Sequence, residues 1–318
     1  MLGRLVDRFV IRDTRRSPVF MWGDVLPLFL SADLRLINLE CVISAKGLKW
    51  KPEIKPFHFR AHPRAIEFLH AARIDGVTLA NNHVLDFGPE ALGECLDLLD
   101  RAGIPHAGAG TLTRALSPMF LHSPLGPMSV LALTDNEPSW EATATYAGVN
   151  YVRVAPSGMM SPYKERIATA IKDARKKSRF VIVSAHVGPN WGAPSPAIQT
   201  FAHELLDLGA DVYWGHSNHA PQGIEISNGK VIMYAAGDFI DDYAVDPIER
   251  NDLSFLFLVE LKGSRVSRIQ LYPTAIENFH VRHARGDERT FLQRSMQAKC
   301  SAFKTPISFQ EGVGTINV

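Results

Sequence analysis

The sequence predicts an α/β protein whose core is a mixed sheet or two packed sheets. Short apolar runs alternate with segments of helical periodicity through the first two-thirds of the 318 residues, an order typical of α/β domains. Beyond residue 230, apolar runs follow one another with no helical segment between them, which indicates further strands. Hydrophobic residues make up 46% and charged residues 21%, so a disordered, coiled-coil or fibrous chain is excluded.

The first part of the chain contains three predicted strands and two predicted helices. Apolar runs predict strands at residues 34–39, 76–80 and 129–133. A helix is predicted at 62–73, where Pro63 suits a first turn. A second helix is predicted at 89–102, because leucines recur at helical spacing and Gly103 follows as a stop.

The second part begins with helices and ends in strands. Helical periodicity predicts a helix at 163–176, and Ser195 is the expected cap of another that begins at Pro196 and stops at Gly209. Strands are predicted at 180–185, 211–214, 231–235, 253–261 and 266–272. The aperiodic segment 136–161 is expected to be a long surface excursion. We expect one domain over residues 1–283 and a C-terminal extension over 284–318.

Charge and cysteine content narrow the class of protein. The 34 basic and 33 acidic residues give a net charge of +1, so a general nucleic-acid binder is not expected. Cys41, Cys95 and Cys300 are widely spaced, which argues against a disulfide framework or a cysteine zinc site. The charged N-terminal residues resemble neither a signal peptide nor an anchor, and no apolar run is long enough for a transmembrane helix. A cytoplasmic protein is the expectation.

Polar residues suited to metal binding follow several predicted strands. They are Glu40, the triplet Asn81, Asn82 and His83, then His186, the pair His216 and His219, and Asp238. In α/β sheets, sites form beyond the carboxyl ends of the strands. Histidine, asparagine and carboxylate ligands suit Zn, Mn, Fe or Ni better than Ca. The number of candidates favours two adjacent ions that activate water for a displacement.

Each of these residues also has an ordinary structural interpretation. Asn81, Asn82 and Asp86 are common turn formers, and Asp238 could begin a turn. Glu40 could be a surface acid, and any of the histidines could be a hydrogen-bonded loop or core residue. For Trp191 and Trp214, burial in the core is favoured over a place in a substrate pocket. The remaining eight histidines do not follow strands and are assigned no role.

Five stretches resemble the CapA family of poly-γ-glutamate capsule biosynthesis proteins, which is similar to the calcineurin-like metallophosphoesterases. They are NLE (38–40), ANNHVLDFG (80–88), SAHVGPNW (184–191), GADVYWGHSNHAPQGIE (209–225) and MYAAGDFIDDY (233–243). The resemblance covers about residues 1–280. It implies a four-layer α/β/β/α metallophosphoesterase-like sandwich with two divalent metal ions, Mn, Zn or Fe, between its sheets.

The resemblance also implies roles for individual residues. The implied metal ligands are Glu40, Asn82, His186, His216 and His219. His83 would be the acid that protonates the leaving group or holds the transition state, and Asp86 would be a catalytic residue that supports the site. Glu225 and Asp238 would support the site by contacting the metal ligands and not the metal ions. The spacing of His216 and His219 is one residue longer than in ordinary phosphoesterases, so their division between two ions stays open.

One departure from the family pattern concerns the start of the chain. Family members open with an apolar strand that ends in Gly-Asp, ahead of a segment like Met1-Leu2-Gly3-Arg4. Asp24 lies in a different segment and is a poor substitute. Either the sandwich lacks its first strand and one metal carboxylate, or Met1 is an internal methionine of a longer protein. The second interpretation is favoured because the later motifs are intact.

The leading functional hypothesis is a metal-dependent hydrolase that uses activated water on a phosphoester or on a γ-glutamyl or other amide bond. The alternative is a non-hydrolytic protein that assembles or exports poly-γ-glutamate. A metal-free binding module is a third possibility if the start at Met1 is genuine. The expected partner is an anionic small molecule or a poly-γ-glutamate-type polymer, and neither nucleic acid nor a membrane segment is expected.

Overall fold

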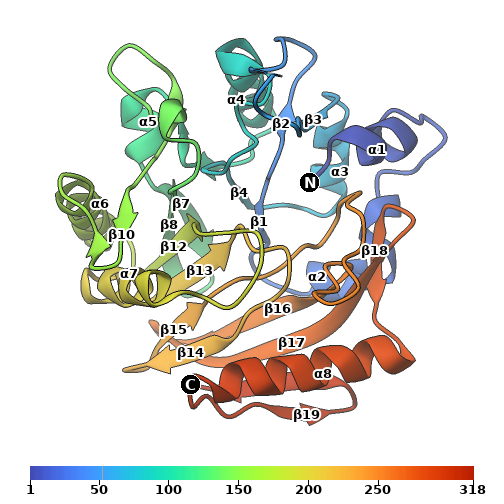
Figure 1. Ribbon diagram of the computed structural model, residues 1–318, viewed down its shortest axis with the longest axis vertical. Helices are drawn as coiled ribbons and strands as arrows, with labels where there is room; N and C mark the ends of the chain where they lie inside the picture. The colour runs from blue at the N-terminus through green and yellow to red at the C-terminus, as the bar shows by residue number, and fades with distance from the viewer. Residues whose placement is uncertain (52) are drawn as a thin grey trace.

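The computed structural model describes residues 1–51 and 53–318 as a mixed α/β fold with several sheets (Figure 1). The largest sheet has the strand order β14-β15-β13-β12-β8-β7. Its central strands β8, β12, β13 and β15 are parallel, whereas the outer strands β7 and β14 are antiparallel to their neighbours. The bounds are β7 (Met119–Ser123), β8 (Gly126–Thr134), β12 (Phe180–His186), β13 (Val212–His216), β14 (Ile224–Ser227) and β15 (Lys230–Met233).

A second sheet is antiparallel and comes from the C-terminal part of the chain. Its order is β16-β17-β20-β19, and β18 also pairs with β17. The strands are β16 (Leu253–Lys262), β17 (Arg265–Glu277), β18 (His280–His283), β19 (Ser308–Gln310) and β20 (Val313–Asn317). Residues 284–318 therefore add two strands and helix α8 (Gly286–Ser301) to this sheet.

A smaller parallel sheet carries the first predicted strand. Its order is β1-β4-β5, with β1 (Leu36–Asn38), β4 (Gly76–Thr78) and β5 (His106–Ala107). Three two-stranded pairs complete the strands: β2 (Val42–Ile43) with β3 (Arg60–Ala61), β6 (Ala109–Gly110) with β9 (Gly148–Val149), and β10 (Val154–Ala155) with β11 (Gly158–Met159).

Helices cover the sheets because each presents one apolar face. Helices α6 (Tyr163–Lys177) and α7 (Pro196–Asp207) share a core with one face of the six-stranded sheet. The other face shares a core with the antiparallel sheet and α8. A third core lies around the N-terminal segment and α3 (Ala65–Ala71) and α4 (Gly88–Arg101). The remaining short helices are α1 (Arg4–Val6), η1 (Asp7–Ile11), η2 (Phe20–Val25), α2 (Leu26–Leu30), α5 (Leu112–Leu116) and η3 (Pro138–Trp140).

The main elements expected from the sequence are present, with small differences at their ends. Ser195 caps α7, since its Oγ accepts a hydrogen bond from the Ile198 N–H. Gly103 has a φ of +68°, which suits the chain reversal after α4. The segment 136–161 differs from the expected surface excursion, because Trp140 is fully buried within it. The sequence of this segment has no periodicity that would indicate a buried residue. The Trp140 ring packs edge-on against that of Trp50. The three cysteines form no disulfide bonds, and all three are buried.

We predict that Glu288→Gln destabilises the C-terminal helix at neutral pH. Glu288 caps the Arg285 N–H at 2.9 Å and pairs with Arg282 at 2.8 Å. Hydrogen bonds from Arg282 lower the Glu288 pKa to about 2 from an ordinary 4.5. The contribution is therefore present above pH 4.5 and disappears as the pH falls towards 2. Denaturant titration should show a loss of about 1 kcal/mol at pH 7 that shrinks below pH 4. Exposed Glu311→Gln is the control, and equal effects of both variants would contradict the prediction.

Candidate functional site

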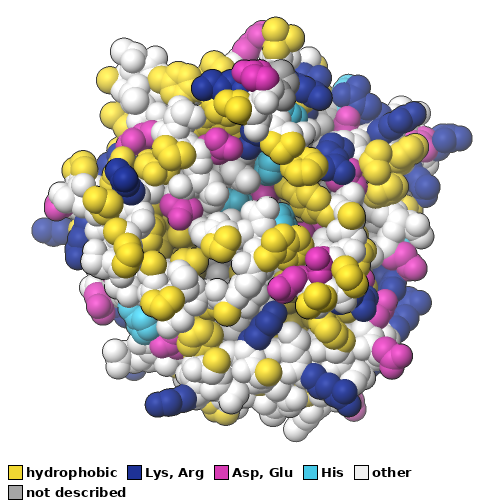
Figure 2. Space-filling model, viewed as in Figure 1, with side chains coloured by type: hydrophobic (Ala, Val, Ile, Leu, Met, Phe, Trp, Pro, Cys, Tyr) yellow, Lys and Arg dark blue, Asp and Glu magenta, His cyan; other side chains and the backbone are white. Residues whose placement is uncertain are grey.

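Polar residues from the carboxyl ends of several parallel strands gather at one place. His186 and His216 end β12 and β13 and are direct partners in the pairing register. Glu40 follows β1, and Asn82 and His83 follow β4. In the space-filling view, histidine and acidic side chains lie in a hollow near the centre of one face (Figure 2). The strand-end arrangement expected from the sequence is therefore formed, and we call these residues the strand-end cluster.

The centre of the cluster is a pair of buried histidines. The Nδ1 atoms of His186 and His216 are 2.8 Å apart, and the His216 Nε2 lies 2.6 Å from the Ser184 Oγ. Burial lowers the pKa of His216 to about 3, and burial together with His216 lowers the pKa of His186. Both rings are therefore neutral at pH 7, and a neutral imidazole has one nitrogen lone pair that can accept a proton or bind a cation.

Glu40 is oriented beside this pair by asparagines. The Asn38 Nδ2 donates to Glu40 at 3.1 Å, and the Asn81 Nδ2 donates to the Asn38 Oδ1 at 3.1 Å. A Glu40 oxygen lies 3.8 Å from the His186 Nε2. Burial raises the pKa of Glu40. Asn81 thus has a structural role, because it connects the ends of β1 and β4.

A second set of polar groups lies near Glu40. It consists of His219, Asp238, Asp241 and the ammonium group of Met1. The His219 Nδ1 is 3.0 Å from the Asp238 Oδ1, and the Met1 ammonium donates to the Ile240 carbonyl at 2.8 Å. Burial raises the pKa of Asp238 to about 7, and burial with Asp238 raises the pKa of Asp241. One oxygen of each aspartate is buried without a hydrogen-bond partner. The sequence analysis missed Asp241, although it lies in the same motif as Asp238.

The Asn82 and His83 segment forms a separate buried dyad. The His83 Nδ1 lies 2.6 Å from the Asp86 Oδ2, which also accepts from the Phe59 N–H at 2.6 Å. Burial raises the pKa of Asp86 to about 7, and burial lowers that of His83. The contact with Asp86 fixes the orientation of the His83 ring. The Asn82 Oδ1 is buried and has no hydrogen-bond partner.

A buried lysine supports this dyad, and no sequence signal indicated it. The Lys55 Nζ donates to the Asn82 carbonyl at 2.7 Å and to Glu137 at 2.8 Å, and it is 3.5 Å from the Asp86 Oδ1. The Lys55 side chain is only 9% exposed. Lys55 belongs to a polar loop, and its proximity to Asp86 arises only when the chain is folded.

We predict that Lys55→Met destabilises the protein strongly, because it leaves the buried Asp86 and the partly exposed Glu137 without their cation. The expected loss is about 3 kcal/mol in the free energy of unfolding, measured by denaturant titration. Lys176→Met is the matched control, because Lys176 pairs with Asp173 on an exposed helix surface. A Lys55→Met variant as stable as Lys176→Met would show that the ion pairs do not contribute.

Close backbone packing positions the turn after β13. A Cβ at Gly215 would lie 2.1 Å from the Tyr234 carbonyl oxygen, so only glycine fits before His216. Ser217 has a φ of +98°, and its Oγ donates to the Gly188 carbonyl at 2.8 Å. The turn carries His216 to Ser184 and His186, and it carries His219 to Asp238.

Some expectations differ from the structure. Glu225 is not brought to the cluster, because it binds the Tyr234 hydroxyl at 2.6 Å and His203 at 3.0 Å. Trp191 is 41% exposed, contrary to the expected burial, and its ring lies beside that of His219. Trp214 is only partly buried and packs edge-on to His216. Asp24 lies elsewhere, bonded to the His283 N–H, as its different segment indicated.

The chemistry of the cluster suits a divalent metal, although its ligand geometry is not formed. Neutral imidazoles and the unpartnered oxygens of Asn82, Asp238 and Asp241 are suitable donors. Within the described part of the chain, however, no three His, Cys, Asp or Glu side chains are arranged as a metal-binding group. His186 and His216 contact each other instead. The donors fit a metal by type, and binding would require the rings to separate.

Comparison with known proteins identifies related sequences. The family model described as "Bacterial capsule synthesis protein PGA_cap" matches residues 1–243. A probable polyglutamine synthesis accessory protein of Mycobacterium tuberculosis is 33% identical over 291 residues, covering 87% of this chain and 75% of that protein. The PGA biosynthesis protein CapA of Bacillus subtilis is 24% identical over 277 residues, covering 87% of this chain and 69% of that protein.

A solved structure was also compared. GAP50, the anchor in the inner membrane complex of Plasmodium, has 11% sequence identity and a TM-score of 0.34 over 69% of this chain and 80% of its own. A similarity this low carries no argument about the fold or the site. Among residues 1–51 and 53–318, no helix has the length and apolar character needed to cross a bilayer.

Proposed function

Because the chain belongs to the bacterial capsule synthesis protein family PGA_cap, we propose that it acts in making a polyglutamate-type polymer as a metal-dependent hydrolase. The bond cleaved would be a phosphoester or a γ-glutamyl amide. The observation that carries this proposal is the convergence of His186, His216 and Glu40 at the ends of neighbouring strands. Neutral buried imidazoles beside carboxylates are typical of a catalytic site and are costly to maintain in a purely structural core.

The proposed metal ligands are Glu40, Asn82, His186, His216 and His219, whose carboxylate, amide and imidazole groups are donor types that divalent metal ions prefer. When bound, two divalent ions would supply Lewis acidity and lower the pKa of water. Asn38 would orient Glu40, and Asp238 would orient His219, as their hydrogen bonds indicate. Mn, Zn or Fe would suit this mixed nitrogen and oxygen set.

In this proposal the dyad of His83 and Asp86 handles the proton of the leaving group. Asp86 accepts from the His83 Nδ1, which leaves the opposite ring nitrogen for a substrate atom. Lys55 would keep Asp86 in place through their shared ion pair. Trp191 is exposed beside His219 and would contact an anionic substrate through its uncharged ring. The negative charge of the substrate would therefore be neutralised by the metal ions.

The same proposal includes the finer description of the fold. The six-stranded sheet and the antiparallel sheet share one core, and helices cover the outer face of the former. These account for three layers of the four-layer α/β/β/α sandwich of the metallophosphoesterase type that we propose. The strand-end cluster would then lie at one edge of the paired sheets.

The first experiment is to measure metal by elemental mass spectrometry, as purified and after loading with Mn or Zn. We expect close to two ions per chain, together with hydrolysis of bis(p-nitrophenyl) phosphate or γ-glutamyl-p-nitroanilide. Ions without hydrolysis of either probe would contradict the proposed reaction. No ion under any loading would reject the metal-dependent enzyme.

A second candidate is a non-hydrolytic accessory role in polymer assembly. The direct contact of His186 with His216 favours it, because a closed pair leaves no space for a metal between the rings. Binding of poly-γ-glutamate by the metal-free chain, measured by calorimetry, would support this role. Absence of such binding, with metal-dependent turnover, would support the hydrolase.

A further inference from the structure

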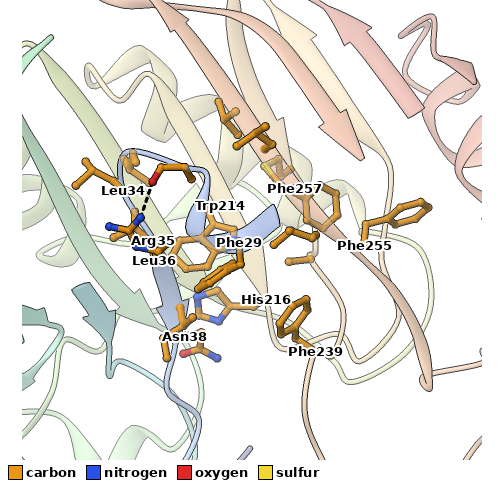
Figure 3. Close-up of a pocket in the computed structure, with 18 of the residues that line it drawn as sticks. Phe29, Leu34, Arg35, Leu36, Asn38, Trp214, His216, Phe239, Phe255 and Phe257 are labelled. Carbon is orange, nitrogen blue, oxygen red and sulfur yellow. Dashed lines mark hydrogen bonds between the residues drawn. The ribbon is translucent and has the colours of Figure 1, made fainter. Parts of the chain in front are cut away.

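The strand-end cluster borders a cavity of about 630 Å³ whose lining is largely apolar (Figure 3). Glu40, His216 and His219 are among the lining residues. Arg35 also lines the cavity, but its guanidinium is bound to Asp75 at 2.7 Å. The described lining therefore offers no free cationic side chain to an anionic substrate, and a protein cation that recognises such a substrate must lie elsewhere around the site.

Lys55 lies beside the dyad, but its ammonium group is already bound. The Nζ donates to the Asn82 carbonyl at 2.7 Å and to Glu137 at 2.8 Å, and it lies 3.5 Å from the Asp86 Oδ1. An ammonium group has three N–H donors, so these three acceptors account for all of them. Lys55 could bind a substrate only by giving up one of its internal partners.

Arg4 lies against two aromatic rings that also contact the site. Its guanidinium carbon is 5.1 Å from the centroid of the Phe59 ring and 5.8 Å from that of the Tyr243 ring. The Phe59 ring packs edge-on to His83 with centroids 4.7 Å apart, and the Tyr243 ring packs edge-on to His219 at 4.8 Å. Arg4 is therefore next to the rings that flank both the dyad and the proposed ligand His219.

The guanidinium of Arg4 is held in place and keeps free donors. Its Nε lies 3.2 Å from the Oδ2 of Asp242, a carboxylate that is almost completely buried. The exposed Phe57 ring lies 5.6 Å from the guanidinium carbon. The Arg4 side chain is 32% exposed, and its two Nη groups have no hydrogen-bond acceptor among the described residues. Two such donors in a rigid fork match the two oxygens of a carboxylate.

The backbone at Arg4 is strained and anchored. Arg4 has a φ of +52°, in the left-handed region that residues other than glycine rarely adopt. The next residue is tied to the same carboxylate, because the Leu5 N–H donates to the Asp242 Oδ2 at 2.8 Å. Strained residues of this kind collect at functional sites, where the surrounding contacts hold them. The anchoring thus fixes where the fork of Arg4 is presented.

We propose that Arg4 binds a carboxylate of the substrate through its Nη groups, and that it selects substrates that carry this carboxylate beside the bond to be cleaved. Each unit of a γ-linked glutamate polymer has such a group, because its α-carboxylate takes no part in the linkage. Asp242 is the positioning residue that holds the Nε of Arg4. The inference rests on the proposed function for its substrate class, and it adds the residue that recognises the substrate.

The first test measures binding by calorimetry, on both the metal-free and the metal-loaded protein. The ligand is a γ-linked trimer of glutamate, compared with the same trimer in which each α-carboxylate is a neutral amide. We expect Arg4→Met to weaken binding of the acidic trimer about ten- to hundredfold, because two charge-assisted hydrogen bonds are lost. Arg8→Met is the matched control and should bind as the parent does, since Arg8 is exposed over the Phe9 ring of the same segment.

The second test compares two substrates of the metal-loaded protein, γ-glutamyl-p-nitroanilide and 4-aminobutyryl-p-nitroanilide, which lacks only the α-carboxylate. Arg4→Met should raise the KM of the first at least about tenfold and leave the KM of the second unchanged. A purely structural role for Arg4 would affect both substrates equally. Arg4→Lys keeps the charge but not the fork, so it should restore only part of the selectivity. It also gives the comparison if Arg4→Met fails to fold.

The inference and the proposed function can fail separately. Binding of the acidic trimer that depends on Arg4, without hydrolysis, would reject the hydrolase and support the inference. Hydrolysis with no change in trimer binding or in KM on Arg4→Met would keep the hydrolase and overturn the inference. Equal binding of the two trimers by the parent protein, or binding of neither, would also overturn it. So would competition by inorganic phosphate as strong as that by glutarate, because the fork would then not select a carboxylate.

Discussion

His186→Ala is expected to abolish metal binding and to lower turnover by at least about a thousandfold. His186 is almost completely buried and lies between His216 and Glu40, so its ring would face any ion held by the cluster. Removing it would take away one proposed ligand and the ring that contacts His216. Metal content by elemental mass spectrometry and hydrolysis of bis(p-nitrophenyl) phosphate would be measured on the same preparation.

The control for this variant separates a chemical loss from a folding defect. His122→Ala changes an exposed histidine on β7 and should leave metal content and turnover unchanged. Thermal melting of both variants would show whether the His186 cavity unfolds the protein. A folded His186→Ala protein with full metal content and normal turnover would remove His186 from the site and reject the proposed centre.

His83→Gln is expected to reduce turnover by a factor of about 10² to 10⁴ while metal content stays near that of the parent protein. His83 is held by Asp86 at 2.6 Å and belongs to the dyad and not to the pair of His186 and His216. Its proposed role is proton transfer, so its loss should affect kcat more than the affinity for metal. Initial rates at saturating substrate and elemental analysis provide the two measurements.

Asp86→Asn should reproduce part of this loss, because the amide cannot accept the Nδ1 proton with the same strength. His106→Gln is a suitable control. His106 is a partly buried histidine, but it contacts Arg114 and takes no part in the dyad of His83 and Asp86. If His83→Gln instead loses metal as completely as His186→Ala, His83 is a ligand and the proposed division of roles is wrong.

Several elements could be predicted because their signals are local. The cap at Ser195, the stop at Gly103 and the apolar strand at 180–185 each depend on neighbours within a few residues. The strand-end positions of His186 and His216 followed from the same patterns, since a parallel sheet brings such ends together. The short N-terminal helices and two-residue strands were missed, because their segments carry too few residues for a clear period.

The α/β class, the order of the main elements, the family and the strand ends at which polar residues collect can all be read from local patterns and motifs in the amino-acid sequence. Contacts in the folded chain were needed to show that Lys55 lies beside Asp86, that Asp241 is next to Asp238, and that Glu225 pairs with His203 instead of joining the cluster. The folded structure also shows that β1 and β16 border the same cavity. These features depend on contacts between segments tens to hundreds of residues apart, and local periodicity carries no information about which distant side chains or strand edges will meet.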